Sequence, residues 1–169
     1  MIYFPDRNLV IVTPFKCGST SLHNHLCSPA VGGLYVIGVQ QDGEIDKHTL
    51  TGPRFGDHGR ANIAIVVRNP VNRLRSIVSY SQLFEPEISF HEVSQRLSGG
   101  LCANQSTLID ESNANQYWKL EHIDDCLNAA GLPSLARRDN RSENRSDLNE
   151  EQIESVRWWW EPDAERFGY

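Results

Sequence analysis

One segment of the chain, residues 13–22, groups small, hydroxylated and basic residues in a way that suits a phosphate group. It follows the apolar run 9–12 and leads into a helical pattern that begins at Ser21. Amide N–H groups at a helix start are unpaired and point the same way, and the helix dipole adds partial positive charge. The sequence therefore predicts a phosphate-binding loop formed by Lys16, Cys17, Gly18, Ser19, Thr20 and Ser21.

This loop differs from the GxxxxGK[ST] pattern of phosphate-loop NTPases, because Lys16 precedes its only glycine, Gly18. Taken alone, the segment also fits an ordinary capped helix start with an exposed lysine. Both interpretations stay open until the second basic segment is considered.

That second segment, residues 68–80, begins with Arg68 at the end of another apolar run. Arg73, Ser76 and Tyr80 follow at spacings of three and four residues, so they share one face of a helix. A guanidinium group with a hydroxyl beside it suits a phosphate monoester. A basic amphipathic surface helix is the alternative for this segment alone.

Two units of strand, loop and helix carry these segments. The first joins strand 9–12 to helix 21–26, and the second joins strand 63–67 to helix 71–83. Such units indicate an α/β fold with a parallel sheet and helices on its faces. Ligands of such sheets bind at the carboxyl ends of the strands, where both loops lie.

The rest of the chain supplies further elements and two irregular stretches. Residues 28–61 are rich in glycine and polar residues and can form part of an acceptor cleft. The arginine-rich loop 133–147 fits a solvated, mobile surface loop as well as it fits a functional one. Expected elements are a strand at 34–39, a helix at 88–97, a strand at 117–120, a helix at 123–130 and a final helix at 149–160.

Three successive tryptophans, Trp158, Trp159 and Trp160, lie in the expected final helix. Neighbouring side chains on a helix point about 100° apart, so at most two of the three can share a face. We therefore expect them to pack the last helix on the core, rather than to form a sugar-stacking platform.

The two basic segments together resemble the nucleotide-binding loops of the PAPS-dependent sulfotransferases, where PAPS is 3′-phosphoadenosine 5′-phosphosulfate. Residues 14–22 resemble the loop that holds the 5′-phosphosulfate, and residues 68–80 match the pattern R-x-P-x-x-R-x-x-S-x-x-x-Y of the 3′-phosphate loop. Residues 119–123, 140–142 and 160–169 are similar to later segments of the branch that modifies carbohydrates. The resemblance spans most of the chain and implies a three-layer P-loop-like fold with a central parallel β-sheet flanked by helices.

The resemblance also implies a role for each candidate residue. Lys16 stabilises the leaving phosphate beside the bridging oxygen, and the loop 17–21 holds the 5′-phosphate. Arg68 and Ser76 hold the 3′-phosphate. Asn140, Arg141 and Ser142 close over the nucleotide, and the product PAP is PAPS without its sulfate. The acceptor is a free hydroxyl, and carbohydrate is the class that the resemblance implies.

The acceptor hydroxyl loses a proton as it attacks, and a group that titrates near neutrality suits this task. We choose His48 as the general base, since relatives that use a histidine carry a similar segment before the second strand. Glu44, Asp46 and His58 are reserve candidates. A surface histidine without any role is the alternative.

Composition narrows the class of protein. A formal net charge of −6 argues against a nucleic-acid binder, which usually carries a basic surplus. The sequence has neither a signal-peptide pattern nor an apolar run of about 20 residues, so we expect a single soluble, cytoplasmic domain over residues 1–169, without a membrane partner. The four scattered cysteines and six histidines lack the spacing of metal ligands, so we expect reduced thiols and no metal.

Two other functions remain open from the sequence. One is a phosphate-loop small-molecule kinase, which the missing glycine spacing and the lack of an acidic residue after strand 63–67 disfavour. The other is a non-catalytic relative that binds the nucleotide without turnover. The sequence does not determine the oligomeric state.

Overall fold

A computed structural model of the chain describes the residues 1–35, 38–39, 45–46, 62–99, 102–107, 114, 116–135 and 147–169. These residues form a mixed α/β structure with an open five-stranded sheet in the order β3-β1-β2-β6-β7. The strands are β1 (Ile2–Phe4), β2 (Leu9–Val12), β3 (Leu34–Tyr35), β6 (Asn62–Val67) and β7 (Gln116–Lys119). The expected α/β class is therefore confirmed.

The sheet is parallel only in part. β2, β6 and β7 run parallel to one another, whereas β1 pairs antiparallel with both β2 and β3. The expectation of a parallel sheet thus holds for the half that carries the two loops and is wrong for the other half. The physical reason is the short connection at residues 5–8, where the 3₁₀ turn η1 (Pro5–Arg7) and the left-handed Asn8 reverse the chain.

Six helices have both ends within the described residues, and two of them follow the two loops. They are α1 (Ser19–Leu26), α2 (Pro70–Phe84), α3 (Phe90–Arg96), α5 (Ile123–Ala129), α6 (Glu150–Ser155) and α7 (Arg157–Phe167), with the 3₁₀ turn η3 (Leu120–His122) before α5. The start of α2 is fixed by Pro70 at its first position and by Asn69, whose side chain accepts from the amide of Asn72. Within the described ranges, no helix has the length and hydropathy that a membrane crossing needs.

Two expected elements are corrected. The run 34–39 does not form one strand, because β3 joins the main sheet while β4 (Gly38–Val39) pairs with β5 (Ile45–Asp46) in a separate sheet. The final helix does not run from 149 to 160, because it breaks at Val156 into α6 and α7 and continues to Phe167. The three tryptophans and Asp163 thus lie together on α7.

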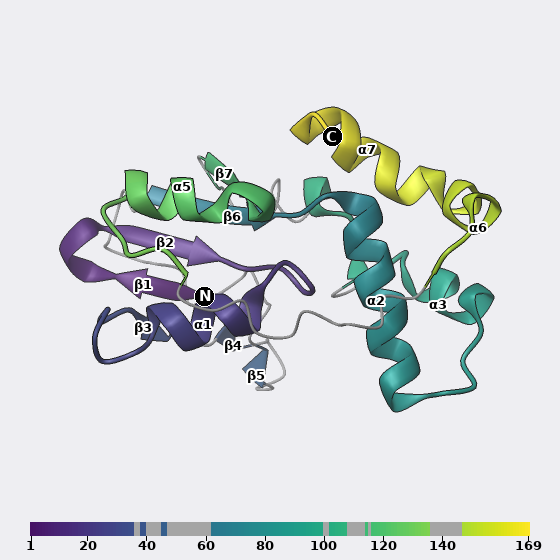
Figure 1. The fold of residues 1–169 in the computed structure, drawn as a ribbon, viewed down its shortest axis with the longest axis horizontal. Coiled ribbons are helices and arrows are strands. Elements are labelled where there is room, and N and C mark those ends of the chain that lie inside the picture. The colour runs from purple at the N-terminus through teal and green to yellow at the C-terminus, as the bar shows by residue number, and fades with distance from the viewer. Residues whose placement is uncertain are drawn as a thin grey trace.

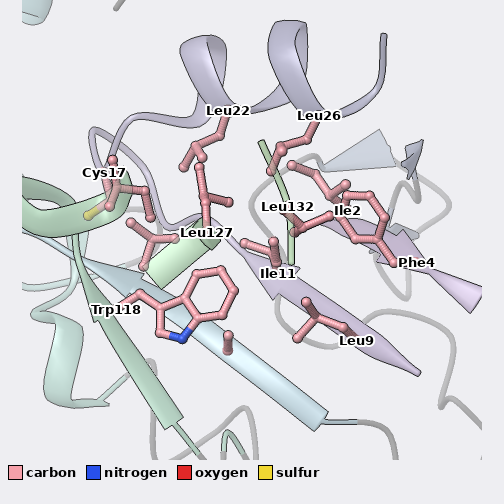
Figure 2. Packing of buried hydrophobic residues seen from close by; sticks show 13 residues of the cluster. Ile2, Phe4, Leu9, Ile11, Cys17, Leu22, Leu26, Trp118, Leu127 and Leu132 are labelled. Atoms are coloured by element: carbon pink, nitrogen blue, oxygen red, sulfur yellow. The ribbon is translucent and has the colours of Figure 1, made fainter. Parts of the chain in front are cut away.

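The main core lies between the sheet and the helices α1 and α5. Leu22 and Leu26 of α1 and Leu127 of α5 meet Ile11 of β2 in this core, and Trp118 of β7 closes it (Figure 2). All four residues of β2 are buried, which is typical of a central strand covered on both faces. On the opposite face, Phe167 of α7 packs with residues of β2 and β6. The central strand is therefore a fixed base for the loop that follows it.

A second apolar cluster joins the helices beyond the end of the sheet. Figure 1 shows α2, α3 and α6 gathered on one side of the molecule, away from α1, with α7 running from α6 back toward the sheet. Leu74, Ile77 and Val78 of α2 pack there with Val156 and Trp159. Of the three tryptophans, Trp159 is buried and Trp158 is 55% exposed, so the expectation of core packing is confirmed for Trp159. This cluster fixes α2, and with it the loop that precedes α2, against α7.

Candidate functional site

The two basic loops lie next to each other at the carboxyl edge of the parallel strands. β2 and β6 pair in register, with Val12 opposite Ile65, so the chain leaves both strands at the same edge. Arg68, immediately after β6, donates from Nη1 to the main-chain carbonyl of Lys16 at 3.0 Å. The structure thus brings together Lys16 and Arg68, which are 52 residues apart in the chain.

The first loop is a tight turn that opens toward a helix start. Cys17 donates its amide to the carbonyl of Pro14 at 3.0 Å, and both Lys16 and Gly18 adopt positive φ angles, of 63° and 82°. No side chain caps α1, and the amides of Ser19 and Thr20 have no acceptor among the described residues. These two amides are the unpaired groups that a helix start offers to an anion.

Gly18 is required by its conformation and by its surroundings. A Cβ atom at this position would lie 2.7 Å from Cδ1 of Leu120, which belongs to η3. The loop therefore rests directly on the turn that follows β7, and no larger residue fits there without movement.

The side chain of Lys16 lies against aromatic rings rather than in open solvent. Its Nζ lies 4.3 Å from the ring centre of Tyr80 and 5.6 Å from that of Phe15. Phe15 and Tyr80 meet edge to face at 5.2 Å, and Phe84 continues the aromatic row 4.9 Å beyond Tyr80. Tyr80 of the second motif thus contacts the first loop.

Arg73, which shares a helix face with Ser76 and Tyr80, has a different environment from Arg68. Arg73 is fully buried, and its guanidinium group donates to the carbonyls of Phe15 at 3.1 Å and Ala103 at 2.8 Å. It also lies 5.2 Å from the ring centre of Trp159. Arg73 therefore holds the first loop against α2, while Arg68 and Ser76 are only half-buried.

A buried polar network that the sequence analysis did not include links both loops to α7. Gln105 accepts from the amide of Arg68 at 2.7 Å and from the Cys17 thiol at 3.2 Å. Asp163 accepts from the amide and side chain of Gln105 and from the amide and hydroxyl of Ser106. Gln105 and Asp163 are fully buried. No local motif marks either residue, so long-range contact is what reveals them.

Glu121 supports the second loop from the other side. It accepts from the amide of Asn69 at 2.9 Å and from the hydroxyl of Tyr169 at 2.8 Å. Burial, and then the hydrogen bond to Glu121, raise the pKa of Tyr169 well above its usual range, so the phenol stays protonated and donates. The segment 119–123, quoted above for its resemblance, thus contacts the 3′-phosphate motif through Glu121.

Cys17 lies under the first loop as a neutral group. Burial raises the pKa of the Cys17 thiol to about 11, although Arg73 and Arg68 nearby act in the opposite direction. The thiol is therefore protonated at neutral pH and donates to Gln105. All four cysteines are free thiols.

Other expected residues and sites are placed elsewhere or not at all. His48, the reserve bases Glu44 and His58, and the residues Asn140, Arg141 and Ser142 lie outside the described residues, and of Asp46 only the strand position in β5 is described. Within the described part of the chain, no group of three or more His, Cys, Asp or Glu side chains could hold a metal.

A cavity of about 380 Å³ lies at the opposite edge of the sheet. Its lining includes Leu9, Asn62 and Gln116, the first residues of β2, β6 and β7. The two basic loops follow the last residues of these strands, so the cavity and the loops are separated by the length of the strands. The cavity is therefore not part of the candidate site.

The arrangement at the carboxyl edge can bind a ligand with two anionic groups. One group can approach the start of α1 beside Lys16, and the other can approach Arg68 and Ser76 at the start of α2. The chain matches no protein-family model, no curated protein and no solved structure. The interpretation of the site therefore depends on its residues and their geometry.

Proposed function

We propose that the protein is a sulfotransferase that moves a sulfuryl group from PAPS to an acceptor hydroxyl, with carbohydrate as the acceptor class. One observation carries the proposal: the Nη1 atom of Arg68 lies 3.0 Å from the carbonyl oxygen of Lys16. This contact joins the two loops that the sequence assigns to the two ends of one nucleotide. In this proposal the α/β sheet belongs to a three-layer P-loop-like fold.

The donor has phosphate groups at both its 5′ and 3′ positions, and the proposed site meets them separately. The amides and hydroxyls of Ser19 and Thr20 hold the 5′-phosphate at the start of α1, whereas the Cys17 amide closes the turn on Pro14. Arg68 and Ser76 hold the 3′-phosphate, which distinguishes PAPS from ATP. Guanidinium groups suit this task, since their planar donors match phosphate oxygens.

The transfer itself needs alignment and charge stabilisation. The acceptor oxygen forms a bond to sulfur, and the bond from sulfur to the bridging oxygen breaks, so that this oxygen leaves on PAP with the negative charge. Lys16 stabilises that charge, as positioned cations do in phosphoryl transfer. The acceptor proton goes to a base, for which His48 remains our prediction, as Asn140, Arg141 and Ser142 do for closure over the nucleotide.

A calorimetric titration tests the proposal. PAP, ADP and ATP are titrated without magnesium into the wild type and the Arg68→Ala variant, with Arg75→Ala on α2 as the matched control. We expect PAP to bind at least tenfold more tightly than ADP or ATP, and Arg68→Ala to abolish this preference while Arg75→Ala keeps it, because a charged hydrogen bond contributes about 1.5–3 kcal/mol.

Other outcomes point to other functions. Equal or tighter binding of ATP, indifferent to Arg68→Ala, contradicts the proposal and favours a kinase. Tight binding of PAP without transfer from PAPS to any hydroxyl in an acceptor screen indicates a nucleotide-binding relative without turnover. Loss of transfer in His48→Ala with PAP affinity unchanged supports the proposed base.

A further inference from the structure

Gln105 pairs with both main-chain groups of Arg68. Its Oε1 accepts from the amide of Arg68 at 2.7 Å, and its Nε2 donates to the carbonyl of Arg68 at 2.9 Å. A side-chain amide presents one donor and one acceptor side by side, as a neighbouring strand does. Gln105 therefore fixes the main chain at the point where β6 has ended and the second loop begins.

The same amide also reaches the first loop. Its Oε1 accepts from the thiol of Cys17 at 3.2 Å, across 88 residues of sequence. One oxygen atom of a fully buried side chain thus contacts both loops. The separation between the loops consequently depends on where this amide lies.

Asp163 of α7 fixes the orientation of the amide. Its Oδ2 accepts from the main-chain N–H of Gln105 at 2.8 Å and from the side-chain Nε2 of Gln105 at 3.0 Å. If Oε1 and Nε2 changed places, the amide nitrogen would meet two donors, the Arg68 amide and the Cys17 thiol. The oxygen would then meet two acceptors, the Arg68 carbonyl and Oδ2 of Asp163. This network therefore permits a single orientation. The exchange would leave buried polar groups without partners, which is unfavourable.

We infer that Gln105 and Asp163 are positioning residues that set the distance between the two anion-binding loops, and thereby favour a ligand that carries both phosphates on one molecule. The inference rests on the proposed two-loop donor site. It assigns selection for the doubly phosphorylated nucleotide to a pair of residues that need not touch it. Binding to either loop alone does not depend on their separation.

The test compares one two-phosphate probe with two one-phosphate probes. PAP, 5′-AMP and 3′-AMP are titrated into the wild type, Gln105→Asn and Asp163→Asn, with far-UV circular dichroism and thermal melting as checks of folding. Gln105→Asn keeps the amide but shortens its reach by one methylene. Ser106→Ala is the matched control, because it removes a hydroxyl bond to the same Asp163 without touching either loop.

We expect Gln105→Asn and Asp163→Asn to weaken PAP binding roughly tenfold, since one charged hydrogen bond to a phosphate contributes about tenfold or more and depends on its geometry. The affinities for 5′-AMP and 3′-AMP should stay within about twofold of the wild type, and Ser106→Ala should leave all three affinities unchanged. The inference would be overturned if, in either folded variant, the affinity fell equally for all three probes or did not fall for PAP. The wild-type preference for PAP over both AMP isomers is read separately, and its absence would count against the proposed function itself.

Discussion

The ammonium group of Lys16 lies 4.3 Å from the centre of the Tyr80 ring, so a side chain of the first loop rests on the helix that follows the second. Such a cation–ring contact contributes about 0.5–1 kcal/mol at an exposed site. This contact is weak enough for a bound anion to draw the Lys16 ammonium group away from the ring, and strong enough to hold it near the loop when no anion is bound. The charge proposed for catalysis is therefore kept close to the proposed donor site.

Removal of this charge should affect the transfer more than the binding of product. We expect Lys16→Met to reduce the rate of PAP release from PAPS, in the presence of a hydroxyl acceptor, by at least about 10²-fold. Affinity for PAP should fall less, because the α1 amides and Arg68 remain. Chromatographic assay of PAP and calorimetry give the two quantities. Tyr80→Phe, which keeps the ring under the ammonium group, is the control and should retain the rate within about threefold.

Substitution of Gly18 should destabilise the fold for two separable reasons. Gly18→Ala places a Cβ at a φ of 82° and 2.7 Å from Leu120, whereas Gly32→Ala has a similar φ of 78° with no atom within 4 Å. We expect Gly32→Ala to lower the free energy of unfolding by about 1–2 kcal/mol and Gly18→Ala to lower it further. Urea denaturation measures both values. Equal losses would show that Leu120 yields without cost.

The buried Cys17 thiol predicts a dependence of stability on alkaline pH. Because its pKa rises from 9.0 to about 11 on folding, the folded chain retains a proton that the unfolded chain releases. This contribution is fully present below pH 9 and is lost as the pH rises toward 11. Between pH 8 and pH 10.5, the free energy of unfolding of the wild type should fall by about 2 kcal/mol more than that of Cys17→Ala. A parallel decline in the two proteins would contradict the burial of the thiol.

Two adjacent tryptophans offer a matched comparison on α7. Trp159 is 1% exposed and donates from Nε1 to the carbonyl of Cys102 at 2.8 Å, whereas Trp158 is 55% exposed. We expect Trp159→Ala to cost about 3–5 kcal/mol of unfolding free energy and Trp158→Ala to stay within about 0.5 kcal/mol of the wild type. Thermal and urea unfolding should rank them in this order. A larger loss for Trp158→Ala would show that its exposed ring has a partner.

Local patterns in the sequence account for much of the fold around the loops. The run 9–12 coincides with β2, and the helix expected at 71–83 is α2, which the structure extends by one residue at each end. β-Branched runs, Pro70 and the cap at Asn69 act over a few residues, so they are visible without the fold. β1 was missed because three residues, Ile2–Phe4, carry too short a pattern.

The candidate site is only partly predictable from local patterns. Lys16 and Arg68 were identified from the local chemistry of their loops, and their proximity followed from parallel strands. Gln105 and Asp163 were not identified, because a polar residue and an acid in helical segments are ordinary on a protein surface. Their importance arises from burial and from partners 37 to 88 residues away, which no local pattern encodes.

The network around Asp163 also bears on when the site can form during synthesis. β2, β6 and β7 can pair as soon as residues up to 119 have left the ribosome, since their partners are already made. Gln105, however, is oriented by an acid 58 residues later, in α7. A growing chain therefore acquires its sheet well before it acquires a fixed spacing between its loops. If the proposed function holds, stalled nascent chains should prefer PAP over the AMP isomers only when α7 has emerged.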